Sequence, residues 1–137
     1  MPRRRRQEPI YTAEEANQAL PWLTDRLRRI SETKEKLAAA EEKMADLYRA
    51  SRSNGHHNMG PAIEEARIQS EGVRAELQRF IDQIRERGIH VRDVDAGVVD
   101  FKGIREGREV WLCWQLGEPE VAHWHEINAG FAHRQPL

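Results

Sequence analysis

The chain has 137 residues, a single cysteine and a formal net charge of -1 at pH 7. This length suits one domain with or without an arm, a single cysteine excludes an intrachain disulfide, and the small net charge gives no global field that would recruit nucleic acid or a membrane surface. Charged residues make up 33% of the chain and hydrophobic residues 39%, a balance that favours a long charged helical hairpin attached to a smaller compact part.

The pattern of cysteine and apolar residues predicts a cytoplasmic protein that does not enter a membrane. A lone thiol beside four tryptophans suits a reducing compartment. No apolar run approaches the ~20 residues that span a bilayer. The basic block Arg3 to Arg6 is followed by Gln-Glu-Pro rather than by the apolar core of a signal peptide.

Residues 1–9 are basic and lack apolar periodicity, so we expect a disordered basic arm. Such an arm can grip the phosphates of a nucleic acid, but a charge run of this kind is more often a solubilising tail. Nucleic acid is therefore a less favoured partner than another protein.

Helix signals begin at residue 12. Thr12-Ala13-Glu14-Glu15 is a capping box, in which the Thr hydroxyl and the Glu carboxylate satisfy free backbone N–H groups. Pro21 predicts that the helix kinks or restarts there. From Trp22 to about Ala50, apolar residues form a narrow stripe of two residues per heptad. The stripe comprises Leu23, Ile30, Leu37 and Met44 with Leu27, Ala40 and Leu47.

A second helix follows a turn-forming segment at residues 51–60. Pro61 occupies the favoured first position of a helix. Gly88 lies just after the predicted end of this helix and suits a left-handed C-cap. The stripe of this helix comprises Ile63, Ser70, Leu77 and Ile84 with Ala66, Val73 and Phe80. Two such helices pack antiparallel, so residues 10–88 are predicted to form a coiled-coil-like helical hairpin. Because narrow stripes bury little, we expect further burial in a homodimer, against another protein or against the C-terminal part.

After Gly88 the pattern changes to the alternation of a β-strand. Glycine-containing turns separate four short stretches rich in branched and aromatic residues. The expected strands are Ile89 to about Val94, Val98 to Phe101, Glu109 to Leu116 and Val121 to Ile127, with Gly130 to Leu137 as an irregular tail. Residues 89–137 are thus predicted to form a small antiparallel β-meander, and the chain is predicted to be α+β.

Chemically capable side chains concentrate between Val110 and Arg134, which hold three of the four Trp, the only Cys and three of the six His. Thiolate and imidazole ligands suit zinc or another divalent transition metal. The candidate metal ligands are Cys113, His123, His125 and Glu126. No C-x-x-C motif accompanies the cysteine, however, and Ala129 interrupts an H-E-x-x-H pattern. A structural thiol among surface histidines therefore stays the simpler alternative.

Whether these ligands meet depends on strand register. His123 and His125 face the same way on a strand, and Trp124 faces the other way. An odd-numbered loop before them would place Cys113 on the histidine face, and an even-numbered loop would place it with Trp124. The sequence leaves both alternatives open.

One expectation does not depend on register. The stretch Val110 to Trp114 is apolar at nearly every position, and a strand that is apolar on both faces is normally buried on both. We therefore expect the helical hairpin or a partner to cover one side of the sheet and the tail around Phe131 to help cover the other. Cys113 should then be poorly accessible.

Two further kinds of site are compatible with the same region. Cys113 beside His125 could act as a thiolate–imidazole pair, which leaves open whether the protein is an enzyme. The candidate ligand-binding residues are charged or aromatic side chains among apolar neighbours: Asp100, Trp114, Glu118, Trp124 and Arg134. Arg134 could clamp a carboxylate bidentately, and an internal carboxylate is the commoner partner.

Several motifs also resemble those of one protein family. The runs are GIHVRDVDAGVVDF, GREVWLCWQLGEPEVAHWHE and GFAHR, with TAEEAN and LP near the N-terminus. They resemble the bacterial family called domain of unknown function 2203, over nearly the whole chain, and the LCW-x-x-GE and WHE elements are fairly specific. The resemblance implies a helical hairpin with a small C-terminal unit, and it implies no particular activity. The positions that match are Asp93, Gly97, Asp100, Phe101, Cys113, Trp114, Gly117, Glu118, Trp124, His125, Gly130 and Arg134. Other members often carry an aromatic residue at the position of His123, which favours His125.

Together these patterns favour a cytoplasmic interaction or ligand-binding module that dimerises through its helical hairpin and carries a Cys/Trp/His-rich β-hairpin head. One alternative is a small metal- or thiol-dependent enzyme that uses Cys113 and His125. A second is a nucleic-acid-associated protein that uses the block Arg3 to Arg6.

Overall fold

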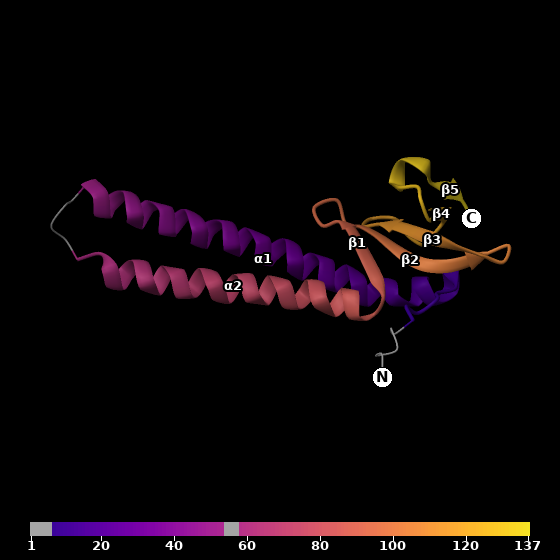
Figure 1. The fold of residues 1–137 in the computed structure, drawn as a ribbon, viewed down its shortest axis with the longest axis horizontal. Helices are drawn as coiled ribbons and strands as arrows, with labels where there is room; N and C mark the ends of the chain where they lie inside the picture. The colour runs from indigo at the N-terminus through magenta and orange to yellow at the C-terminus, as the bar shows by residue number, and fades with distance from the viewer. Residues whose placement is uncertain (1–6, 54–57) are drawn as a thin grey trace, which may run out of the picture. The chain divides into compact units, whose positions relative to one another are not determined.

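The computed structural model describes residues 7–53 and 58–137, which form two helices followed by an antiparallel sheet (Figure 1). Helix α1 spans Ala13–Ser53 and helix α2 spans Gly60–Glu86. The predicted α+β class with a helical hairpin is therefore confirmed. The block Arg3 to Arg6, on which the nucleic-acid hypothesis rests, lies outside the described residues.

Neither of these two helices contains an apolar segment that could cross a membrane.

The sheet has five strands whose spatial order is their order in the chain, and each pairs antiparallel with the next. The strands are β1 (Ile89–Asp93), β2 (Val98–Arg105), β3 (Arg108–Gln115), β4 (His123–Glu126) and β5 (Gln135–Pro136). The prediction of an irregular tail was wrong, because a short 3₁₀ helix η1 (Phe131–His133) leads into β5, which pairs with β4. A terminal proline is tolerated in β5 because this strand lies at the edge of the sheet.

Helix α1 begins at the predicted capping box. The Thr12 hydroxyl oxygen accepts a bond from the Glu15 backbone N–H at 3.0 Å, and the Thr12 N–H donates to the Glu15 carboxylate at 3.2 Å. The helix continues through Pro21 and does not restart there. A proline inside a helix costs about 3 kcal/mol, but burying a leucine contributes about 1.5–3 kcal/mol, and Leu20 and Leu23 are both buried. Their packing is sufficient to offset the proline.

The described residues 28–53 and 58–81 form one compact unit, in which the two helices face each other along the predicted stripes. Ile30 and Ala66 are buried in this seam. Thr33 is also buried, and its hydroxyl donates to the Arg29 carbonyl at 2.7 Å, so this polar side chain is satisfied within α1. Most other stripe residues are half-buried, namely Leu37, Ala40, Met44, Leu47, Ile63, Val73, Leu77 and Phe80.

The described residues 7–27 and 82–137 form a second compact unit, which contains the sheet. The start of α1 packs on the sheet face that carries Phe101, which we call the helix face. The rings of Tyr11 and Phe101 lie 5.0 Å apart, and the Val121 N–H donates to the Asn17 side chain at 2.6 Å. The residues from Val110 to Trp114 are all buried, which confirms that β3 is covered on both sides.

The segment before α1 is held against the same unit. The Tyr11 N–H donates to the Lys102 carbonyl at 2.8 Å, and the Tyr11 hydroxyl donates to the Arg87 carbonyl at 2.5 Å. Glu8 lies 2.9 Å from His90 and 3.2 Å from Lys102. The expected disordered arm covered residues 1–9; residues 1–6 lie outside the described part, whereas Glu8 contacts the sheet.

Removing the Tyr11 hydroxyl tests how firmly this segment is attached. Tyr11→Phe keeps the ring against Phe101 but deletes the bond to the Arg87 carbonyl, so we expect the free energy of unfolding to fall by about 1 kcal/mol. Urea unfolding followed by circular dichroism measures the change. Tyr48→Phe, on the exposed surface of α1, is the matched control and should leave stability unchanged. An equal effect of both substitutions would contradict the assigned role of Tyr11.

Candidate functional site

The register of three strands gathers polar side chains on the sheet face opposite the helix face. Asp100 on β2 pairs with Cys113 on β3, and Cys113 pairs with His123 on β4; Trp111 pairs in turn with His125. Because directly paired residues point to the same face, all of these side chains share one side. The structure therefore selects the odd-loop alternative, with Cys113 on the histidine face. We call this side the tail face, because the segment after β4 covers it.

Asp100, Cys113 and His125 form a buried cluster on the tail face, here called the triad. Their potential ligand atoms all lie within 4.8 Å of one another. Nε2 of His125 lies 3.0 Å from Oδ1 of Asp100. The three residues are only 2%, 0% and 2% exposed. Two of the four predicted metal ligands, Cys113 and His125, thus come together, and Asp100, predicted as a ligand-binding residue, completes the group.

The hydrogen-bond partners of His125 indicate which of its ring nitrogens carries a proton. Its Nδ1 lies 3.0 Å from the Glu126 backbone carbonyl, which can only accept, so Nδ1 carries the proton. Its Nε2 faces the carboxylate of Asp100, whose other oxygen accepts a bond from Arg92 Nε at 2.9 Å. A neutral imidazole has one N–H only. The contact between Nε2 and Oδ1 therefore requires a second proton or a bound cation.

The Cys113 thiol is a weak acid in this setting. Burial, together with the charge and hydrogen bond of Asp100, raises the pKa of Cys113 to about 12. Since the thiolate is the reactive form, a buried thiol with this pKa is a poor nucleophile at neutral pH. Burial and the raised pKa of Cys113 therefore do not support a reactive thiolate–imidazole pair, although Cys113 and His125 lie close together.

A second polar group on the tail face contains two predicted ligand-binding residues. Nη2 of Arg134 donates to Glu118 Oε2 at 2.6 Å and to His123 Nδ1 at 2.5 Å. Burial opposes ionisation of Glu118, but hydrogen bonds from Arg134 and the Gln115 backbone N–H hold the pKa of Glu118 below its usual value. The carboxylate that Arg134 clamps is therefore internal, and His123 belongs to this group rather than to the triad.

The remaining predicted site residues lie elsewhere. Trp114 is buried, and its indole N–H donates to the Glu118 carbonyl at 3.0 Å. Trp124 shares the helix face, since it pairs with Leu112. Glu126, a predicted metal ligand, instead accepts bonds from Arg108 at 2.5 and 3.3 Å. The structure does not bring these three residues to the triad.

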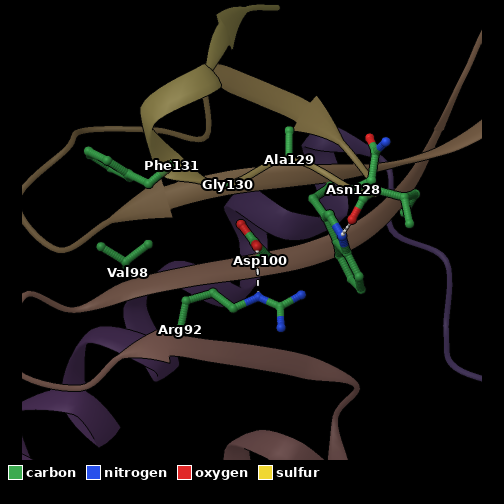
Figure 2. Close-up of a pocket in the computed structure, with 9 residues that line it drawn as sticks. Arg92, Val98, Asp100, Asn128, Ala129, Gly130 and Phe131 are labelled. Carbon is green, nitrogen blue, oxygen red and sulfur yellow. Dashed lines mark hydrogen bonds and ion pairs between the residues drawn. The ribbon is translucent and has the colours of Figure 1, made fainter.

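A pocket of about 380 Å³ opens above Asp100 on the tail face (Figure 2). Asp100 and Arg92 lie below, and the segment from Asn128 through Phe131 passes over them. Trp111 holds this covering segment, because its indole N–H donates to the Ile127 carbonyl at 3.3 Å. The lining residues are Arg92, Val98, Asp100, Trp111, Ile127, Asn128, Ala129, Gly130 and Phe131.

Sequence reasoning missed Arg92 and Trp111 as site residues. The Arg92 guanidinium carbon lies 4.8 Å from the Trp111 ring centroid, a cation–π contact. The predicted meander already places β2 between β1 and β3, and this order brings Arg92 and Trp111 to either side of β2. The position of Arg92 also depends on a register irregularity between Val91 and Asp93, which the sequence does not reveal.

The burial of the triad predicts that the Cys113 thiol reacts slowly with a disulfide reagent. In native protein treated with a chelator, we expect Cys113 to react with a bulky aromatic disulfide at least about a hundredfold more slowly than in protein unfolded in urea, because the thiol is buried and protonated. Absorbance of the released thiol measures both rates. Comparable rates in the native and unfolded states would contradict this assignment.

Comparison with known proteins places the chain in a family. A family model described as uncharacterized conserved protein (DUF2203) matches residues 9–137. No curated protein and no solved structure matches the chain. Because the match spans nearly the whole chain, including both helices and the entire sheet, this protein belongs to the DUF2203 family.

Proposed function

We propose that this protein is a ligand-binding module whose site is the pocket above Asp100, and that its ligand is a small organic anion with a carboxylate or phosphate group. The observation that carries the proposal is the state of Arg92. Its side chain lines the pocket and is 45% exposed, and among the described residues its one hydrogen-bond acceptor is Asp100, through Nε. Its terminal amino groups therefore supply donors for an anion.

The rest of the lining supports a ligand with a flat apolar body. Trp111, Val98 and Phe131 contribute apolar surface, and the volume of about 380 Å³ falls in the range of small-molecule sites. Phe131 is 45% exposed, so a bound ring would cover apolar surface that solvent otherwise touches. Such burial contributes about 25 cal/mol per Å².

The charge of Asp100 does not exclude an anion. Both of its carboxylate oxygens already accept hydrogen bonds or contacts, one from Arg92 and the other from His125. Lys102 lies nearby, but its ammonium is paired with Glu8 at 3.2 Å and with Glu109 at 3.6 Å, so the donors for an anion come from the terminal amino groups of Arg92.

Matched probes test this site. We expect benzoate or phenyl phosphate to bind more tightly than neutral benzyl alcohol, as measured by isothermal titration calorimetry. Arg92→Gln should weaken binding of the anion roughly ten- to hundredfold, since a hydrogen bond to a charged group contributes about 1.5–3 kcal/mol. A stronger response to one anion than to the other identifies which acidic group the site prefers.

Arg105→Gln is the control for this substitution. Arg105 lies over Trp124 at 4.9 Å, much as Arg92 lies over Trp111, but on the helix face. The control should bind the anions like the wild type. Equal binding of benzyl alcohol and the anions, or no binding of either anion at millimolar concentration, would argue against the proposal.

We also propose that the helical hairpin forms a homodimer. The stripe residues of the unit 28–81 are mostly half-buried, so pairing of one hairpin leaves apolar surface that a four-helix arrangement would cover. Tyr48 and Ile68 add exposed apolar side chains, at 46% and 58% exposure.

A free buried thiol at Cys113 supports the cytoplasm as the proposed compartment.

Sedimentation equilibrium at micromolar concentration tests the dimer. The expected mass is twice the chain mass of 16.0 kDa. The double variant Tyr48→Lys/Ile68→Lys should shift the equilibrium toward the monomer while it keeps its helical circular dichroism, because both side chains are exposed. A wild type that sediments at the chain mass throughout this range would exclude the dimer.

A further inference from the structure

We propose that Asp100, Cys113 and His125 form a site for a divalent transition metal of the zinc class, which adjoins the anion pocket and shares Asp100 with it. The donor set is one thiolate, one imidazole and one carboxylate, drawn from three adjacent strands. Zinc, cobalt and ferrous iron accept such mixed sulfur, nitrogen and oxygen ligands, whereas calcium and magnesium take oxygen ligands only.

The spacing of the triad is close to what a tetrahedral ion needs. Metal–ligand distances of about 2.0–2.3 Å place two ligands of one ion roughly 3.3–3.6 Å apart. Nε2 of His125 and Oδ1 of Asp100 are 3.0 Å apart, and the Cys113 sulfur completes a group within 4.8 Å. Small adjustments of side-chain torsions would therefore bring all three atoms to one ion, without a change in strand register.

Two of the three ligands already have the outer partners that orient metal ligands. A ligating histidine commonly donates its second ring N–H to a carbonyl or carboxylate, and His125 Nδ1 lies 3.0 Å from the Glu126 carbonyl. This leaves Nε2, with its lone pair, aimed at the triad. Ligating carboxylates are commonly hydrogen-bonded in turn, and Arg92 holds the second oxygen of Asp100 at 2.9 Å.

The charge of the set also favours a dication. Binding of the ion would displace the proton of the Cys113 thiol to solvent, because a thiol must be deprotonated to ligate a metal. The carboxylate, the thiolate and a neutral imidazole then sum to two negative charges, which a divalent ion neutralises in a region that is at most 2% exposed. The same ion would take the place of the second proton that the contact between Nε2 and Oδ1 requires. Asp100 lines the pocket, so the pocket supplies a path by which the ion reaches the triad.

Metal titration of purified wild type tests the site directly. Protein stripped with a chelator is titrated with Zn²⁺ in competition with a chromophoric chelator, and separately with Co²⁺ under reducing, anaerobic conditions. We expect one ion per chain and, with Co²⁺, a thiolate-to-metal charge-transfer band together with the visible bands of tetrahedral cobalt. This spectrum needs no variant, so it decides the question even if a triad variant fails to fold.

Variants then assign the ligands. Cys113→Ser should abolish the charge-transfer band, and Asp100→Asn or His125→Gln should lower zinc affinity by more than about a hundredfold, beyond the usual effect of losing an outer partner. Arg92→Gln should lower it roughly ten- to hundredfold, as loss of an outer partner does.

Two controls separate this site from its neighbours. His123 lies on the same strand and face as His125 but belongs to the Glu118–Arg134 group, so His123→Gln should keep wild-type zinc affinity. Phe131→Ala changes only the wall of the pocket and should keep it too. If the protein binds the anions but no metal, the metal site is wrong and the anion pocket stands. If it binds metal but neither anion, the anion pocket is wrong and the metal site stands. A folded wild type without the thiolate–cobalt band, or zinc affinity unchanged in Cys113→Ser, would overturn the metal site.

Discussion

The pairing of β3 with strands on both of its sides determines which side chains meet in this protein. Cys113 lies opposite Asp100 on one neighbour and opposite His123 on the other. A register shift of one residue would turn the Cys113 side chain to the helix face and separate it from both. The triad, the floor of the pocket and the ion pair of Glu118 with Arg134 all depend on this single alignment of three strands.

The two faces of the sheet differ in the kind of side chain that they bury. The helix face is an apolar core, built around Phe101 and the start of α1, and it stabilises the unit by burial. The tail face buries Asp100 and His125, and removing such groups from water costs several kcal/mol per charge before pairing offsets it. Apolar residues of similar size would often stabilise a sheet as well or better. The metal site proposed for the triad would account for a polar cluster at this position.

The helical hairpin was predictable because heptad spacing and end signals such as Gly88 are local in sequence. The strand Gln135–Pro136 was not, since two residues show no alternation and its partner lies earlier in the chain. Cys113 and His125 could be chosen by ligand type, but their contact depends on the parity of a loop that the sequence leaves ambiguous. Arg92 carries no motif at all, and only the position of its strand beside β2 brings it to the site.

The bond between the Trp111 indole and the Ile127 carbonyl gives the molecule an optical reporter of its own. Trp111 lies in the pocket wall, whereas Trp114 and Trp124 belong to the opposite face. The emission of an indole depends on the polarity around it and on the partner of its N–H. Movement of the segment that carries Ile127 would therefore change the fluorescence of one tryptophan more than that of these two. The covering segment can thus be followed in solution without any attached dye.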